Sequence, residues 1–297
     1  MTALIALDWG VSSLRAWRIA GDGAILETRR AATGILGVSQ GGFPAAFASA
    51  VGDWTAGAPH APVLLCGMIG PRQGWVEAPS PPAPAGLPDL VAALASVEVE
   101  GRRVARIVPG VSLRDGARAE VMRGEETQIV GAAGEGERLV ILPGSHSKWA
   151  RTNDARILDF STFMTGELYA ALKDHTILGR GLAATPADDA DAFAAGAAQA
   201  REGLAGALFQ TRARTLLGGL TPGDAGAFLS GLVIGAEIEE GLARYGAPAR
   251  PPLLVGAPAL IARYQGAFAL RGVATEAAGE ETAAAGAFAI ARAARLI

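Results

Sequence analysis

The chain has 297 residues, half of them apolar, with a formal net charge of −3 and a pI near 5.7. This length suits two domains of ordinary size, and the weak negative charge offers no field for a phosphate backbone, so we expect no nucleic-acid partner. Every apolar run is broken by Gly, Pro or charge before the roughly 20 residues that a membrane span needs, so we expect no membrane segment.

The cysteine content and the first residues indicate the compartment. Cys66 is the single cysteine and lies at the end of the apolar run 62–66, which excludes an internal disulfide and suits a buried thiol in a reducing compartment. The apolar residues 1–7 have no basic region before them and end at Asp8, so they predict a strand and not a signal peptide. We therefore expect a cytoplasmic protein.

The first part of the chain alternates short β-like runs with tight turns. The pattern predicts three meandering strands, at 4–8, 14–20 and 24–29, with a turn at 21–23 between the last two. Further along, the predictions are a helix over 42–54, a buried strand over 62–67, a Pro/Gly-rich stretch over 70–88, a strand over 103–108 and a helix over 118–133.

The opening pattern recurs from Leu139. Residues 139–151 can be laid over 4–18, because both contain a strand, a Gly/Ser turn and a returning strand, and each leads through a polar turn into a third strand that carries Ile-Leu. Such a repeat predicts two related α/β domains. Two unrelated β-hairpins are the alternative interpretation.

The rest of the chain is mainly helical. Helices are predicted over 166–178, 187–200, 204–217 and 224–245, followed by a strand over 253–256, a helix from Pro258, a strand over 267–275 and a last helix over 280–295. We place the domain boundary near Pro109-Gly110, which gives domains 1–109 and 110–297, and we expect the last helix to pack back on the first domain.

The turn after the first strand combines a carboxylate, a glycine and two hydroxyls. Phosphoryl transfer needs a carboxylate for Mg²⁺, here Asp8, and a turn whose N–H and hydroxyl groups face phosphate oxygens, here Gly10, Ser12 and Ser13. An ordinary hairpin turn with Asp as a turn former is the alternative.

A second turn of this kind follows the strand at 139–142. Its phosphate-binding candidates are Gly144, Ser145, Ser147 and Lys148, and His146 is a candidate for contact with the acceptor. Of the 26 lysines and arginines, only Lys148 and Lys173 are lysines. A lysine among so many arginines indicates a need for its compact ammonium group, which suits a phosphate oxygen as a point charge. A Ser-His hydrolase is the competing interpretation. However, a serine and a histidine that are neighbours in one turn rarely have the mutual geometry that a nucleophile and its base need.

Two further segments carry charged and polar groups that suit a polar ligand. Glu125 and Glu126 are adjacent in a predicted helix, where only one of them can face a cleft and act as a general base, although acids also suit a helix N-terminus whatever the function. Arg72 and Gln73 lie in the loop after the strand at 62–67, where a guanidinium can bind a carboxylate. A plain surface loop is the alternative there.

Glycines in the helical half suggest an adenosine site. Gly231 and Gly235 lie within a predicted helix, while Gly256 and Ala257 lie at a strand-to-helix junction, and small residues let a purine approach the backbone. Close helix packing explains the first pair equally well.

In this order, the motifs resemble the 2-dehydro-3-deoxygalactonokinase family of the actin/hexokinase-like sugar kinase superfamily. The resemblance is carried by five segments, at 8–13, 67–75, 123–128, 142–149 and 163–169. It implies two ribonuclease-H-like domains with ATP and Mg²⁺ in an interdomain cleft, and transfer of the γ-phosphoryl group to the 6-hydroxyl of 2-dehydro-3-deoxygalactonate in galactonate catabolism.

The resemblance also implies roles for single residues. It assigns Mg²⁺ to Asp8 and the general base to Glu125, with Glu126 and Asp8 as the other choices, because the segment has Glu where related sugar kinases have Asp. The substrate-binding set is Trp9, Arg72, Gln73, His146 and Thr165. The second turn departs from the superfamily pattern, having Pro143 in place of an acid.

Other functions of the same fold stay open as alternatives. A phosphatase or polyphosphate-type hydrolase would use Glu125 and Glu126 to position water, and a sugar-binding regulator would do no chemistry. A homodimer is compatible with the sequence, which does not give the oligomeric state.

Overall fold

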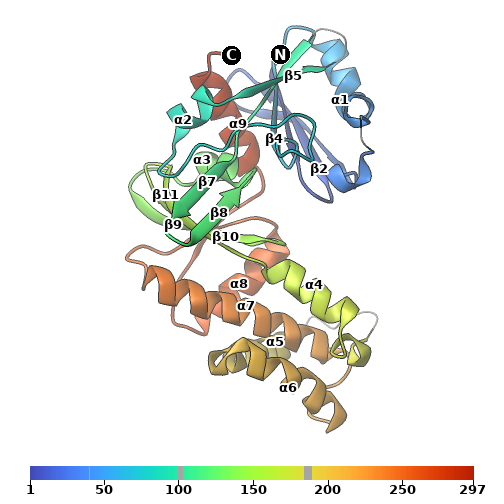
Figure 1. Cartoon of the computed structure of the whole chain (residues 1–297), viewed down its shortest axis with the longest axis vertical. Helices are drawn as coiled ribbons and strands as arrows, with labels where there is room; N and C mark the ends of the chain where they lie inside the picture. Colours follow the sequence, from blue (N-terminus) through green and yellow to red (C-terminus); the bar gives the residue numbers. More distant parts are fainter. Residues whose placement is uncertain (40, 100–102, 184–188) are drawn as a thin grey trace. The chain divides into compact units, whose positions relative to one another are not determined.

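The computed structural model describes residues 1–39, 41–99, 103–183 and 189–297 (Figure 1). It divides into two compact units. The first unit comprises Met1–Glu137, Ala150–Phe160 and Ala278–Ile297, and the second comprises Arg138–Trp149 and Ser161–Ala277. The chain thus leaves the first unit after Glu137 and returns to it twice. The two units are therefore not divided at a single point near Pro109-Gly110.

A six-stranded mixed sheet forms the centre of the first unit. Its strand order is β3 (Ile25–Ala31), β2 (Leu14–Ala20), β1 (Thr2–Trp9), β4 (Val63–Gly67), β6 (Arg103–Ile107) and β5 (Ala95–Val99). β1, β4 and β6 are parallel to one another, whereas β2, β3 and β5 are each antiparallel to a neighbour. The predicted three-strand meander and the strands near 62–67 and 103–108 are confirmed.

The two faces of this sheet are covered by different helices. Since side chains alternate along a strand, Ile5, Leu7 and Trp9 share one face, where they pack in a core with Phe47 and Val51 of helix α1 (Phe43–Gly57). Helix α9 (Thr282–Ala293) contacts β1, β2 and β4 and also packs on α2 (Leu87–Ala92) and α3 (Glu125–Ala132). Asp8 therefore points away from the α1 face.

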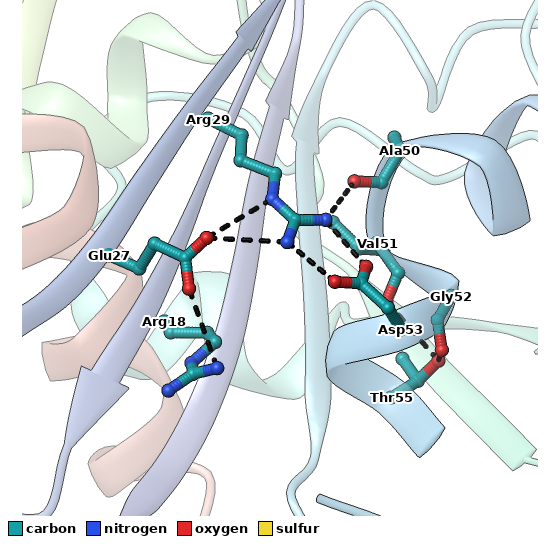
Figure 2. A network of polar contacts seen from close by, with 8 residues as sticks. All are labelled: Arg18, Glu27, Arg29, Ala50, Val51, Gly52, Asp53 and Thr55. Atoms are coloured by element: carbon teal, nitrogen blue, oxygen red, sulfur yellow. Dashed lines mark hydrogen bonds and ion pairs between the residues drawn. The ribbon is translucent and has the colours of Figure 1, made fainter. Parts of the chain in front are cut away.

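An arginine on β3 fixes helix α1 to the sheet edge (Figure 2). Arg29 forms two hydrogen bonds with the Asp53 carboxylate, of 2.5 and 2.6 Å, and donates to the Ala50 carbonyl over 3.1 Å. Its guanidinium also lies 4.2 Å from the ring centroid of Trp54. The hydrogen bond from Arg29 lowers the pKa of Asp53 to about 2, so this pair persists throughout the neutral range.

The second sheet repeats the strand order of the first. Its order is β11 (Arg156–Phe163), β10 (Ser147–Asn153), β9 (Glu137–Leu142), β12 (Leu253–Val255) and β13 (Glu276–Ala278), with β9 and β12 parallel. In both sheets the first three strands of the repeat lie in reverse order, as β3-β2-β1 and β11-β10-β9. The next strand in each sheet, β4 or β12, is parallel to the first strand of the repeat and follows a helical segment in the chain. The predicted repeat of the opening pattern at Leu139 is confirmed by this topology.

The described part of the second unit contains five helices. They are α4 (Thr165–His175), α5 (Ala190–Gln199), α6 (Leu204–Leu216), α7 (Asp224–Tyr245) and α8 (Pro258–Ala269), and all five were predicted. The predicted start of α5 at 187 lies outside the described residues. Short 3₁₀ turns occur at Ile35–Gly37, Gly179–Gly181 and Ala200–Glu202. Within the described ranges, none of the helices has the length and apolar character to cross a membrane.

Two predicted elements are wrong. The helix expected over 118–133 is a strand followed by a shorter helix: β8 (Arg118–Met122) pairs with β7 (Val111–Asp115), and α3 begins only after Gly124, whose positive φ of 106° breaks any continuous helix. The strand expected over 267–275 is the end of α8 and a turn, and the edge strand β13 comes later. The elements α2, β5 and β7 had not been predicted.

Candidate active site

Three backbone segments of the first unit meet beside the Asp8 carboxylate. Asp8 lies near the end of β1, and Gly67 lies at the end of the parallel strand β4, in register with Trp9. A Cβ on Gly67 would lie 2.9 Å from Asp8 Oδ1, and a Cβ on Gly124 would lie 3.1 Å from the Gly67 Cα. Both glycines have positive φ values, of 87° and 106°, so the close approach depends on glycine.

Asp8 is ion-paired on its other oxygen. Arg15 Nη2 lies 2.5 Å from Asp8 Oδ2, and Arg15 Nη1 lies 3.0 Å from Glu280 Oε1, next to the start of α9. Burial acts to lower the pKa of Arg15, but the charge and hydrogen bond of Asp8 outweigh it, and the pKa is raised. Asp8 is therefore a largely buried carboxylate, 7% exposed, whose charge is balanced from one side.

The donor set fits Mg²⁺ bound mainly by water and phosphate. No group of three or more His, Cys, Asp or Glu side chains that could hold a metal occurs among the residues with a described position. Mg²⁺ in phosphoryl-transfer sites usually takes one or two carboxylates and fills its other positions with waters and phosphates. Asp8 can supply such a carboxylate, through Oδ1 on the side of Gly67 and Gly124.

The two adjacent glutamates lie in different environments. Glu126 is fully buried and accepts hydrogen bonds from Gly124 N and Thr127 Oγ1, over 2.7 and 2.9 Å. Its burial and then the charge of Glu125 raise the pKa of Glu126 to about 8. Glu125 is only partly buried and accepts from Arg123 N over 3.0 Å. Of the two, Glu125 is the one whose side chain is partly accessible.

The predicted first phosphate turn is a closed hairpin turn with exposed hydroxyl residues. Gly10 N donates to Ser13 O over 2.8 Å, and Ser12 and Ser13 are exposed. Trp9, predicted to bind substrate, is instead fully buried, and its indole N–H donates to Thr33 O over 3.1 Å. The side chain belongs to the core under α1, and its substrate contact stays a prediction.

The loop after β4 leaves its polar residues accessible. The Arg72 side chain is 84% exposed, with Nε 3.6 Å from Glu77 Oε2, and Gln73 is exposed as well. The loop itself is anchored, because Trp75 stacks on Phe43 at a centroid distance of 6.1 Å. Arg72 is thus held near the end of β4 by its loop, while its guanidinium faces solvent.

In the second unit, the predicted second phosphate turn lies beside the starts of two helices. A Cβ on Gly166, in the first turn of α4, would lie 2.7 Å from Gly144 O, and Glu167 N donates to Ser145 O over 3.1 Å. Gly256, with a φ of 156°, comes just before α8, and its Cβ position lies 3.6 Å from Pro143 O. The N–H groups at helix N-termini favour phosphate.

The side chains of this turn point in different directions. Ser145 and His146 are exposed, and the His146 ring hydrogen-bonds to Glu167. Lys148 is 4% exposed, and its Nζ donates to His146 O over 3.0 Å. The Ser147 hydroxyl is buried and donates to Glu237 Oε1 over 2.6 Å. The Ser147 hydroxyl therefore faces the interior beneath the turn, and its phosphate contact stays a prediction.

Three other predicted site residues are also placed in the interior. Thr165 is 7% exposed and its side chain hydrogen-bonds to Glu237, while its substrate contact stays a prediction. A Cβ on Gly231 would lie 2.0 Å from Phe193 O, and one on Gly235 would lie 2.7 Å from Ala197 O, both on α5. Helix packing explains these two glycines, whereas Gly256 and the exposed Ala257 lie at the start of α8.

Several residues of the site were missed from the sequence. Arg15 could have been found by pairing the first two predicted strands, since it lies opposite Asp8 in the register. Glu237 had a sharper signal, because it is the single charged residue in the apolar run 225–238. Gly67 and Gly124 depend on long-range contacts and carried no comparable signal.

Comparison with known proteins places the chain in a family. The family model for 2-keto-3-deoxy-galactonokinase matches residues 8–290. The 2-dehydro-3-deoxygalactonokinase of Escherichia coli (strain K12) is 38% identical over 287 residues, covering 95% of each chain. The DgoK1 protein of Rhizobium meliloti (strain 1021), a candidate enzyme of the same name, is 44% identical over 254 residues, or 81% of each chain.

Solved structures agree with this placement. The crystal structure of a candidate 2-dehydro-3-deoxygalactonokinase from Sinorhizobium meliloti has a TM-score of 0.89 and 41% identity, covering 98% of each chain. The activator of the 2-hydroxyisocaproyl-CoA dehydratase from Clostridium difficile shares the fold, with a TM-score of 0.53 and 13% identity over 99% of this chain and 96% of that chain. The predicted α/β class, with two mixed sheets of the actin/hexokinase-like ATPase fold, is confirmed. The chain belongs to the 2-keto-3-deoxy-galactonokinase family of sugar-acid kinases.

Proposed function

We propose that the chain transfers the γ-phosphoryl group of ATP to the 6-hydroxyl of 2-dehydro-3-deoxy-D-galactonate. The family match over residues 8–290 carries this proposal, because a kinase of this family uses ATP and a sugar acid. The E. coli relative bears the name of this activity and is similar over nearly its whole length. The product would be the 6-phosphate of the sugar acid and ADP.

Asp8 supplies the charge on which the proposed chemistry depends. It would hold a hydrated Mg²⁺ through Oδ1, and the ion would neutralise charge on the phosphate oxygens as the phosphoryl group moves. Arg15 orients Asp8 by pairing with Oδ2 over 2.5 Å. Gly67 and Gly124 leave room beside Oδ1, since a Cβ on Gly67 would lie 2.9 Å from it.

Glu125 is the proposed general base. In the transfer step, the substrate O6 forms a bond to the γ-phosphorus while the bond from that phosphorus to the β–γ bridging oxygen breaks, and the hydroxyl proton passes to the Glu125 carboxylate. Glu125 suits this role because it is partly exposed, whereas Glu126 is fully buried. Arg72 would bind the substrate carboxylate through its exposed guanidinium.

The second unit would hold the nucleotide phosphates. Support comes from the Gly144-Ser145 backbone, which lies against the first turn of α4, and from Gly256, which lies at the start of α8 beside Pro143. Two helix N-termini next to one glycine turn form a set of N–H groups that suits phosphate oxygens. Lys148 follows the same turn and would add a positive charge.

An acceptor panel tests this function directly. ADP release would be measured with Mg-ATP and 2-dehydro-3-deoxy-D-galactonate, its C4 epimer 2-dehydro-3-deoxy-D-gluconate, a neutral hexose, or no acceptor. We expect turnover with the galactonate derivative, weaker turnover with its epimer and negligible release without acceptor. Equal ADP release with and without acceptor would point to a hydrolase of the same fold and reject the proposal.

A further inference from the structure

A buried carboxylate of the second unit has no role in the chemistry described above. Glu237 lies in the middle of α7, is 3% exposed, and is the sole charged residue between 225 and 238. Its burial raises its pKa, and hydrogen bonds from its neighbours oppose that effect. An acid in such a place is costly unless its oxygens are fully satisfied.

Four donors from three other elements surround Glu237. Oε1 accepts from Ser147 Oγ over 2.6 Å and from Trp149 Nε1 over 2.7 Å, and Oε2 accepts from the Tyr264 hydroxyl. The Thr165 side chain also hydrogen-bonds to this carboxylate. Trp149 can only donate, so Oε1 acts as an acceptor in this arrangement.

The donors come from the segments that shape the proposed phosphate site. Ser147 is the first residue of β10, directly after the turn at Gly144-Ser145, and Thr165 is the first residue of α4, next to Gly166. Tyr264 belongs to α8, whose start follows Gly256. A single carboxylate therefore connects the turn with both helices, and its anchor α7 is almost entirely buried along its first two-thirds.

We infer that Glu237 is a positioning residue for ATP, which fixes the Gly144-Ser145 turn and the starts of α4 and α8 in the arrangement that binds the phosphates. This inference rests on the proposed function, because it takes these segments as the nucleotide site. Glu237 lies beneath the site and does not touch the nucleotide. Its loss would let the turn and the two helices shift by fractions of an ångström, which is enough to weaken phosphate contacts and to misplace the reacting group.

The test compares Glu237→Gln with Glu239→Gln. Both remove a charge from α7 with little change in shape, but Glu239 pairs with Arg201 and Arg271, at 3.7 and 3.0 Å, and contacts none of the phosphate segments. For Glu237→Gln we expect the KM for ATP to rise by about tenfold or more and kcat to fall, with the KM for the sugar acid within about twofold of wild type. Glu239→Gln should keep all three values.

A folded Glu237→Gln enzyme, judged by circular dichroism, with unchanged KM for ATP and unchanged kcat would overturn the inference. So would equal increases in the KM values of both substrates, which indicate a general loss of structure. If Glu237→Gln does not fold, Tyr264→Phe removes one donor hydroxyl and keeps the ring. A KM for ATP several-fold above wild type then supports the inference, and an unchanged value overturns it.

Calorimetric titration with Mg-ADP separates this inference from the proposed function. A wild-type protein that binds Mg-ADP but transfers no phosphate to the sugar acid would reject the proposed reaction alone. In that case weaker binding by Glu237→Gln supports the positioning role, and equal binding rejects it. A wild-type protein that binds neither Mg-ADP nor Mg-ATP would overturn both.

Discussion

Arg15 Nη2 lies 2.5 Å from Asp8 Oδ2, and the two residues face each other directly in the register of β2 and β1. The pairing divides the work of the Asp8 carboxylate. Oδ2 is held by the arginine, while Oδ1 lies beside Gly67 and Gly124, where a Cβ would be in contact with it. A carboxylate that is fixed through one oxygen, with only glycines beside the other, suits a hydrated Mg²⁺.

Asp8→Asn should lose turnover by about 100-fold or more, because an amide cannot supply the negative charge that the metal and Arg15 both use. Its circular dichroism spectrum should match that of wild type. The matched control is Asp22→Asn in the hairpin between β2 and β3, where Asp22 only accepts from Ala24 N over 3.0 Å. Near-normal kcat in a folded Asp8→Asn protein would remove Asp8 from the mechanism.

Glu126 predicts a specific dependence of stability on pH. The pKa of Glu126 is about 8 in the folded chain, well above its ordinary value of 4.5. Between these two pH values the folded state therefore binds a proton that the unfolded state has lost. Its contribution to the free energy of unfolding is therefore greatest below pH 4.5 and is lost as the pH rises through 8. Urea unfolding of wild type and Glu126→Gln at pH 5.5, 7 and 8.5 measures this contribution.

The difference in stability, wild type minus Glu126→Gln, should fall steadily from pH 5.5 to 8.5. Glu125→Gln serves as the control, because Glu125 is partly exposed. Burial is the larger cause of the raised pKa of Glu126, so this variant should keep most of the pH dependence of stability. A difference that is constant over this range would show that Glu126 does not take up a proton on folding.

Arg72→Ala should raise the KM for the sugar acid by roughly tenfold and leave the KM for ATP unchanged, because the lost contact is a charged hydrogen bond to the substrate carboxylate. Steady-state kinetics with each substrate varied in turn measures both values. Arg114→Ala removes an exposed arginine from β7 of the same unit and should change neither. An unchanged KM for the sugar acid would exclude Arg72 as the carboxylate-binding residue.

Gly231→Ala should destabilise the chain by about 1–3 kcal/mol, since the added Cβ would lie 2.0 Å from Phe193 O in the packed α5–α7 interface. Gly206→Ala, in α6 with nothing within 4 Å of its Cβ position, should be neutral or slightly stabilising. Thermal unfolding measures both. A Gly231→Ala protein with normal stability and a raised KM for ATP would instead favour the adenosine role.

Local patterns predicted those parts of the fold that depend on neighbouring residues. The meander of β1 to β3 follows from the alternation of apolar residues, and the helix α7 follows from their helical periodicity. The repeat of the opening pattern at Leu139 predicts the second sheet. The predicted helix over 118–133 failed because Val121 and Met122 fit a helical spacing equally well, and only the pairing of β8 with β7 selects the strand.

Local motifs in the sequence indicate candidate groups for the site but not the direction of their side chains. Asp8 and the turn at Gly144 were found as local motifs, whereas Trp9, Ser147 and Thr165 turned out to face the interior. Burial of those three is decided by partners far along the chain, such as Thr33 for Trp9 and Glu237 for Ser147, which lie 24 and 90 residues away. No spacing within a motif contains that information.

The most direct test of the proposed reaction is to determine which oxygen of the sugar acid carries the transferred phosphate. The product formed from Mg-ATP and 2-dehydro-3-deoxy-D-galactonate would be analysed by NMR correlation of ³¹P with the sugar protons. We predict one phosphomonoester signal that correlates with the two C6 protons and grows in step with ADP. Phosphate bonded elsewhere on the sugar, or inorganic phosphate as the sole product beside ADP, would contradict the proposed transfer to the 6-hydroxyl.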